Sequence, residues 1–131
     1  MRVGLLIVAH RYIGSEILTA ASRTLGLCPL QTSSLEILDE EELETLVERG
    51  RRMISQLDDG AGVLILTDAY GSTPANVAVA AGGARRCRVV TGLNLPMLLR
   101  VFNYPSRTLE ELAGSAAAGG RAGIIEVDRQ P

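Results

Sequence analysis

Aromatic side chains are scarce in this sequence: phenylalanine, tyrosine and tryptophan together make up 3% of its 131 residues, and tryptophan is missing altogether. Hydrophobic residues nevertheless reach 47%, so the core must be built from aliphatic side chains. A chain of this length fits the commonest size of one domain and can bury a core without metal or disulfide staples. We therefore expect residues 1–131 to form a single globular domain.

Long hydrophobic runs are also missing. Apolar runs such as Gly62–Leu66 fall far short of the roughly 20 residues that cross a bilayer, so we expect no membrane insertion. Met1 and Arg2 lead directly into an apolar run without the cleavage site of a secretory signal, which predicts a cytoplasmic protein. Thirteen basic and fifteen acidic residues leave a net charge of −2, which argues against a nucleic-acid partner.

Residues for metal and nucleotide binding are few. The two cysteines, Cys28 and Cys87, lie far apart, and the single histidine, His10, has no second ligand at metal-binding spacing. We expect two buried free thiols and no metal site. The sequence contains no G-x-x-x-x-G-K-[ST] loop, and no G-x-G-x-x-G follows the first apolar run, which argues against bound ATP or dinucleotide. No cofactor is expected.

What the sequence does contain is a regular alternation of strand-like and helix-like segments. The unbroken apolar run at residues 3–9 is typical of a strand covered on both faces in a parallel sheet. Further strands are predicted around 35–37, 63–67, 88–91 and 122–127, and helices at 15–25, from Asp39 to 57, 75–81, 96–102, and after Ser106 as far as a break at Gly119-Gly120. This alternation predicts a doubly wound α/β fold with a mainly parallel sheet flanked by helices.

Two polar side chains follow neighbouring strands of that predicted sheet. With the usual strand order 2-1-3-4, the winding reverses between the strands that end at His10 and Asp68, and ligands bind at such a reversal. Adjacent strands lie about 4.8 Å apart, so the two side chains can touch. A carboxylate that accepts one imidazole N–H fixes the tautomer and makes the other nitrogen a better nucleophile. Ser72 and Thr73 come next, where a hydroxyl and helix N–H groups can hold phosphoryl oxygens.

Each of these residues also has a plainer interpretation. A lone histidine is often structural, Asp68 can cap its loop, and Ser72 and Thr73 can form an ordinary turn and helix cap. Arg11 either favours an anion beside the imidazole or is merely solvated. The residues taken alone therefore leave open a small-molecule-binding domain with a structural histidine.

Three segments resemble the mannose-family enzyme IIA of the bacterial phosphoenolpyruvate:sugar phosphotransferase system (PTS): LLIVAH ending at His10, LTDAYGSTPAN and TGLNLPMLL. The resemblance spans nearly the whole chain. It implies a sheet of order 2-1-3-4 with an added antiparallel edge strand exchanged between the subunits of a homodimer, in agreement with the strand expected at 122–127. The family commonly has glycine directly after the histidine, whereas this chain has Arg11 and Tyr12.

The resemblance also implies an activity and its residues. His10 would be phosphorylated, Asp68 would orient its ring and Thr73 would contact the phosphoryl group, with Ser72 at a position where the family often has glycine. The protein would be a phosphotransferase that accepts a phosphoryl group from the histidine-phosphocarrier protein HPr and passes it to enzyme IIB, without nucleotide or metal. An alternative is a regulatory module whose phosphorylation at His10 controls binding of a partner protein, without a sugar permease.

Overall fold

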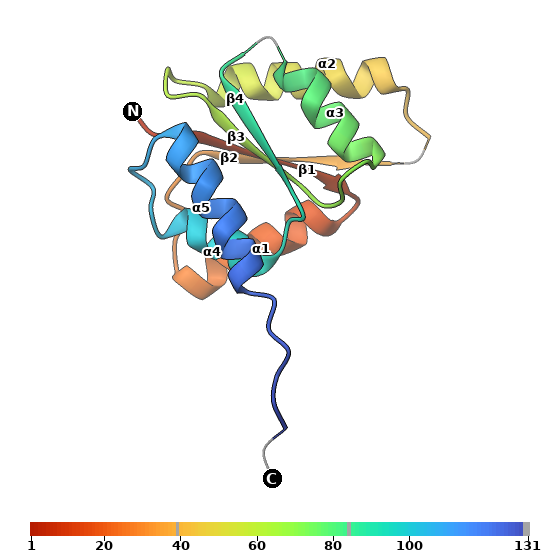
Figure 1. Ribbon diagram of the computed structural model, residues 1–131. Coiled ribbons are helices and arrows are strands. Elements are labelled where there is room, and N and C mark those ends of the chain that lie inside the picture. The colour runs from red at the N-terminus through yellow and green to blue at the C-terminus, as the bar shows by residue number, and fades with distance from the viewer. Residues whose placement is uncertain (39, 84, 130–131) are drawn as a thin grey trace.

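Four parallel strands form one sheet in the order β2-β1-β3-β4 in the computed structural model (Figure 1), which describes residues 1–38, 40–83 and 85–129. The strands are β1 (Gly4–His10), β2 (Thr32–Ile37), β3 (Val63–Thr67) and β4 (Cys87–Thr91). The helices are α1 (Ile13–Leu25), α2 (Leu43–Leu57), α3 (Thr73–Gly82), α4 (Leu95–Phe102) and α5 (Leu109–Ala122). The predicted α/β class and strand order are confirmed.

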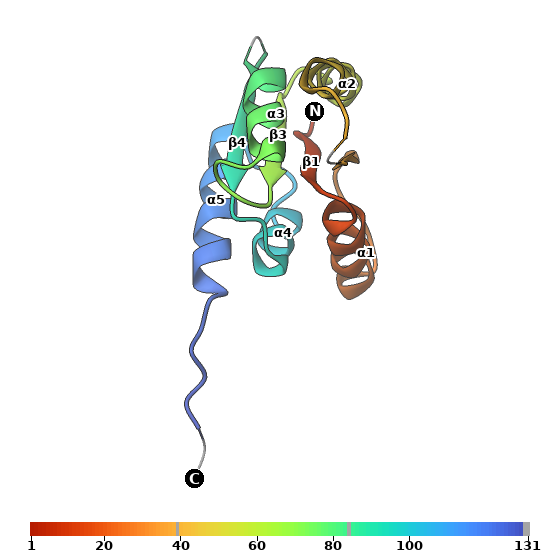
Figure 2. The same ribbon diagram turned by 90° about the vertical axis from the view of Figure 1, so that its right-hand side faces the viewer.

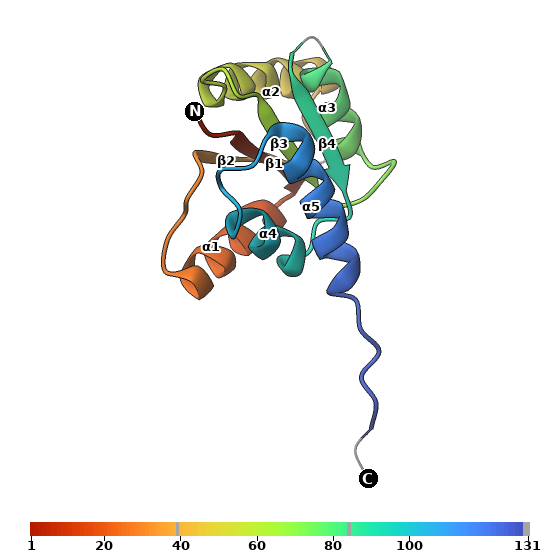
Figure 3. The same cartoon turned by 60° about the vertical axis from the view of Figure 1, so that its left-hand side comes forward.

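The sheet is the middle layer of three, and each face has its own hydrophobic core. Figure 1 places α2 and α3 on one face, and α1, α4 and α5 on the other, which Figure 3 brings forward. Successive residues of β1 alternate between the two cores: Leu5 and Ile7 pack with α1, α4 and α5, whereas Leu6 and Val8 pack with α2 and α3. Because both faces are covered, the strand needs no polar alternation, and its sequence is an unbroken apolar run.

The predicted helix starts differ from the observed ones by a few residues. The largest shift concerns α2, which begins at Leu43 with Glu42 as its extended N-terminal neighbour, although the acidic run suggested an earlier start. Asp39, the predicted first residue, lies outside the described residues. Acidic side chains favour the vicinity of a helix N-terminus as well as its first turn, so such a run locates a helix start only approximately.

The prediction that both cysteines are buried is wrong. Cys28 is exposed and Cys87 is half-buried. Cys28 lies in the connection that follows the left-handed Gly26 at the end of α1, and Cys87 begins β4, which is an edge strand. Edge and connection positions leave one side of a residue uncovered, which composition alone does not reveal.

The predicted helix break at Gly119-Gly120 is also wrong, because α5 continues through both glycines to Ala122. The two glycines are buried where α5 packs closely against α4. A Cβ atom at Gly119 would lie 2.5 Å from Cβ of Arg100, and one at Gly120 would lie 2.9 Å from Cε of Met97. Close helix packing therefore explains these glycines, and it outweighs their weak helix propensity.

The segment after α5 extends away from the body of the domain (Figures 1 and 2). Residues 124–129 pair with no strand of their own chain, and Ile124, Ile125 and Val127 are 77%, 72% and 81% exposed. Ala122, the first residue of the predicted strand, belongs instead to α5. Exchange of this segment between two copies stays a prediction.

Two glycines of α5 provide a matched test of the helix packing. We expect Gly119→Ala to lower the free energy of unfolding by about 1–2 kcal/mol, because the new methyl group meets the backbone-proximal atoms of Arg100. Gly114→Ala should instead raise it by about 0.5–1 kcal/mol, because no atom lies within 4 Å of its added Cβ and alanine favours helix. Urea unfolding measures both. Equal effects of the two substitutions would contradict the close α4–α5 contact.

Candidate functional site

His10 is the last residue of β1 and lies at the edge of the sheet where the parallel strands end, the edge that Figure 2 faces. Its side chain is 43% exposed, although every preceding residue of the strand is buried. Because Val8 of β1 pairs with Thr67 of β3, the register brings Asp68, the residue after β3, beside the end of β1. The sheet therefore brings His10 and Asp68 together, as the strand order predicts.

One carboxylate oxygen of Asp68 accepts two hydrogen bonds from His10. Oδ2 lies 3.0 Å from the backbone nitrogen of His10 and 2.7 Å from Nδ1 of its ring. The other oxygen, Oδ1, accepts the backbone N–H of Ala69 at 3.0 Å. Asp68 thus fixes both the main chain and the ring of His10, so the ring has one preferred orientation.

The charge state of Asp68 decides which ring nitrogen is available. Burial by itself raises the pKa of Asp68, but the hydrogen bonds from the backbone and ring of His10, the charge of that ring and the N–H of Ala69 outweigh it and lower the pKa below its ordinary value. The carboxylate is therefore ionised at neutral pH and can only accept hydrogen bonds. In the neutral ring, Nδ1 of His10 therefore holds the hydrogen, and Nε2 carries the lone pair.

The loop after Asp68 places Ser72 and Thr73 at the start of α3. Ser72 is the N-cap: its hydroxyl donates to the carbonyl of Ala69 at 2.6 Å and accepts from the N–H of Ala75 at 3.4 Å. This is the plainer role that the sequence left open for Ser72. Thr73, the first residue of the helix, is exposed, and its side chain forms no hydrogen bond with another described residue.

The N-terminus of α1, the first helix after His10, already holds an anion of the protein itself. Oε1 of Glu36 accepts the backbone N–H of Ser15 at 2.9 Å and the hydroxyl of Ser34 at 2.9 Å. Helix N-termini favour negative charge, so Glu36 occupies the position where a bound anion would otherwise lie. The N-terminus of α3, in contrast, has Ser72 as its cap and an exposed Thr73.

Exposed apolar side chains gather at the same edge, a feature that sequence reasoning missed. They lie in the connections after β1, β2 and β3 and at the starts of α1 and α2, and their exposed fractions range from 40% to 90%: Tyr12, Ile13, Leu38, Leu43 and Tyr70. A depression of about 260 Å³ beside the imidazole is lined by His10, Arg11, Ile37 and Leu38. The sequence does contain a signal that could have predicted this exposed surface, namely apolar residues shortly after the predicted strand ends.

Among residues 1–38, 40–83 and 85–129, no group of three or more histidine, cysteine, aspartate or glutamate side chains could hold a metal ion. In the same ranges, no helix is both long enough and apolar enough to cross a membrane. The fold and the site together define a small parallel α/β protein with one carboxylate-oriented, half-exposed imidazole at the carboxyl ends of its strands.

Comparison with known proteins identifies the family. The family model EIIA-man, described as PTS system fructose IIA component, matches residues 4–116. The mannose/sorbose-specific IIA subunit of the phosphotransferase system from Enterococcus faecalis aligns over all of this chain and 98% of its own, with 25% identity and a TM-score of 0.89. The PTS IIA protein associated with the fucose utilization operon of Streptococcus pneumoniae aligns over 90% of each chain, with 26% identity and a TM-score of 0.75.

The chain therefore belongs to the EIIA-man family of phosphotransferase-system IIA components. Among curated proteins, the mannose-specific EIIAB component of the Escherichia coli PTS is 27% identical over 134 residues. That alignment covers all of this chain but 41% of the relative, so the chain spans about two fifths of the length of the curated relatives it matches.

The role of Asp68 in fixing the tautomer can be tested directly. We expect ¹⁵N NMR of the His10 ring at neutral pH to find the hydrogen on Nδ1, because Oδ2 of Asp68 is an ionised acceptor. In Asp68→Ala the acceptor for Nδ1–H is lost, so the ring should lose its preference for the Nδ1–H tautomer. An unchanged Nδ1–H tautomer in this variant would contradict the assignment.

Proposed function

We propose that this protein is a histidine phosphocarrier of the phosphotransferase system, which accepts a phosphoryl group from phospho-HPr on Nε2 of His10 and passes it to a histidine of enzyme IIB. The observation that supports this most directly is the 2.7 Å hydrogen bond between Nδ1 of His10 and Asp68, which leaves Nε2 as the available nitrogen of a half-exposed ring. In this proposal residues 1–131 act as one IIA domain in the cytoplasm.

The proposed reaction moves one phosphoryl group between two imidazoles. The lone pair of Nε2 attacks phosphorus in line with the bond to the donor nitrogen; that bond breaks, and its electron pair returns to the donor ring. His10 keeps the hydrogen on Nδ1, so the phosphorylated ring is cationic, and the ionised Asp68 at 2.7 Å stabilises that charge. Transfer to enzyme IIB is the same step in reverse. It requires alignment and electrostatic stabilisation rather than nucleotide or metal chemistry.

Thr73 is the proposed contact for the phosphoryl oxygens. It lies at the N-terminus of α3, where backbone N–H groups and the helix dipole favour negative charge. Ser72 could also contact the phosphoryl group, but its hydroxyl hydrogen is donated to Ala69, so a second donated bond would require it to give up the first. We therefore assign the direct contact to Thr73, and to Ser72 mainly the support of the loop.

The apolar side chains around His10 support a protein partner rather than a small-molecule substrate. Tyr70 and Tyr12 are 90% and 55% exposed, and exposed aromatic and aliphatic clusters of this kind suit protein docking. HPr and enzyme IIB are the partners that the proposed carrier requires. A regulatory module would use the same site and differ in its acceptor, so transfer to enzyme IIB distinguishes the two functions.

The proposed carrier should acquire a single phosphoryl group when it is incubated with phosphoenolpyruvate, enzyme I and HPr. Intact mass spectrometry measures the gain, and the product should be labile in acid and stable in base, as expected for phosphohistidine. His10→Ala should remain folded, because the side chain lies at a strand end and is half-exposed, and should take no label. Loss of the label on addition of enzyme IIB supports transport, and retention supports regulation. An unchanged wild-type mass would exclude both.

Thr73 can be tested with a pair of substitutions. We expect Thr73→Ala to slow phosphorylation by phospho-HPr about tenfold to a hundredfold, which corresponds to the roughly 1–3 kcal/mol of a hydrogen bond to a charged group. Thr73→Ser retains the hydroxyl and should stay close to wild type. Rapid-quench kinetics measure the rates. Equal rates for the alanine and serine variants would remove the hydroxyl from the mechanism.

We also propose a homodimer in which the segment after α5 adds to the sheet of the other copy. β4 is an edge strand, and depressions of about 420 and 570 Å³ flank it, one toward α4 and α5 and the other toward α3. Ile124 lines the first of them. An unpaired edge strand beside an exposed apolar segment favours aggregation. Exchange of the segments between two copies would pair the hydrogen-bonding groups of β4 and cover the apolar side chains of the segment.

Truncation of the segment tests the dimer. Removal of residues 123–131 leaves α5 intact and should yield monomers or aggregates by light scattering, because β4 loses its added strand. Removal of residues 128–131 retains Ile124, Ile125 and Val127 and should preserve the dimer. A stable dimer after the longer truncation would refute strand exchange.

A further inference from the structure

We propose that Arg11 is a phosphoryl-binding residue, and that its guanidinium group shifts the phosphotransfer equilibrium toward the phosphorylated protein. This inference rests on the proposed phosphorylation of His10 and adds a residue to that site.

Arg11 is held beside the imidazole by its main chain. Its backbone N–H donates to the carbonyl of Ile37 at 3.2 Å, which extends the β1–β2 pairing one residue beyond His10. His10 and Arg11 line the same depression of about 260 Å³. Arg11 is the cation among the four lining residues, and Ile37 and Leu38 are apolar. A phosphoryl group on the ring would thus have a guanidinium group for a neighbour.

The side chain of Arg11 is also oriented. Its Cζ lies 4.2 Å from the centre of the Tyr12 ring, a cation–π contact. Stacking uses the flat face of the guanidinium and leaves the N–H groups at its rim free to donate. That rim suits phosphate, because its parallel N–H groups match two phosphoryl oxygens.

The two ring nitrogens would then have opposite electrostatic neighbours. The carboxylate of Asp68 is hydrogen-bonded to Nδ1, on the ring that becomes positive when it is phosphorylated. The guanidinium group of Arg11 would pair with the phosphoryl group on Nε2, which brings a charge of about −1.5 to −2. The site is open to solvent, so the effect of Arg11 should be modest. We expect it to favour the phosphorylated form about three- to tenfold.

The test measures an equilibrium rather than a rate. Wild type and variants are mixed with HPr and phospho-HPr at known ratios, and the phosphorylated fraction is read by intact mass. Arg11→Gln should lower the equilibrium constant three- to tenfold, and Arg11→Lys should lower it less, because a charge remains without the paired donors. The difference should shrink at 1 M salt, since screening weakens an exposed pair.

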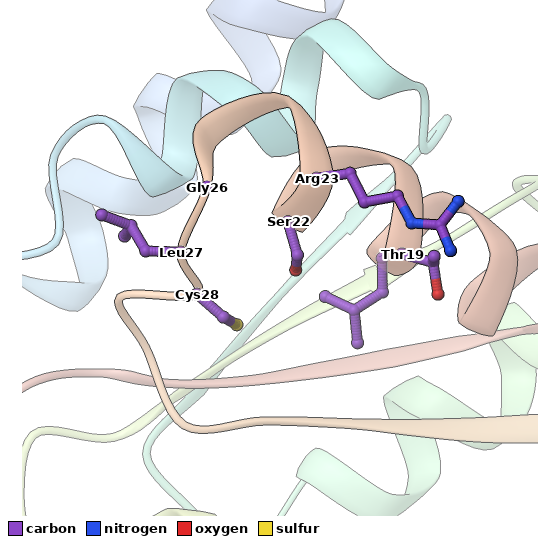
Figure 4. A pocket seen from close by; sticks show the side chains of 7 residues that line it. Thr19, Ser22, Arg23, Gly26, Leu27 and Cys28 are labelled. Atoms are coloured by element: carbon purple, nitrogen blue, oxygen red, sulfur yellow. The ribbon is translucent and has the colours of Figure 1, made fainter.

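Arg23→Gln is the matched control. Arg23 is an exposed arginine in the last turn of α1, at the end of the helix away from His10, where it lines a shallow groove with Thr19, Ser22 and Cys28 (Figure 4). Its loss removes the same charge from the protein, so an effect of net charge alone would appear in both variants. We expect Arg23→Gln to match wild type.

The contact between Arg11 and Tyr12 allows a second, independent test. Tyr12→Ala should reproduce part of the effect of Arg11→Gln, because the guanidinium loses its support, and Tyr12→Phe should retain the wild-type equilibrium. If wild type is labelled on His10 and Arg11→Gln has the same equilibrium constant at low salt, the role of Arg11 is overturned and the phosphocarrier function stands. A wild-type protein that accepts no phosphoryl group overturns both.

Discussion

The contact between His10 and Asp68 is the interaction on which the site depends. One carboxylate oxygen binds both the main chain and the ring of His10, at 3.0 and 2.7 Å, so the position of the strand end and the orientation of the imidazole are set by a single group. The contact exists only because β1 and β3 are neighbours in the sheet, with Val8 opposite Thr67. The buried hydrophobic cores on the two faces hold those strands in place, and thereby hold the imidazole.

This arrangement was largely predictable from sequence. Apolar runs that end in His10 and Asp68, together with the usual winding of α/β sheets, predict that the two side chains meet. The pattern could not predict which ring nitrogen Asp68 engages, because that depends on the backbone bond that also holds Oδ2. The predicted helix break at Gly119-Gly120 was wrong for a different reason. Glycine has the same low helix propensity whether it ends a helix or allows another helix to approach closely, and only the neighbouring helix, here α4, distinguishes the two cases. The exposures of Cys28 and Tyr70 likewise depend on neighbours distant in sequence.

The site and the free sheet edge occupy different parts of the domain. His10, Asp68 and Thr73 lie where the strands end, and the open hydrogen-bonding groups of β4 run along the side of the sheet. Apolar residues accompany both regions: Tyr12 lies next to His10 in the chain, and Tyr70 lies after β3 and also lines the depression of about 570 Å³ beside β4. A chain added along β4 would therefore leave the strand ends accessible to a docking protein.

Glu36 occupies one of the two helix N-termini near the strand ends. Because its carboxylate is bonded to the N-terminus of α1, a free phosphate, or the pyrophosphate of a nucleotide, would meet a resident negative charge at the place where many α/β proteins bind such groups. A phosphoryl group attached to the imidazole is tethered, and it needs no affinity of its own to remain there. In the proposed carrier, the bond to the imidazole would keep the phosphoryl group near α3, and α1 would offer no second site for it because Glu36 already occupies that helix N-terminus.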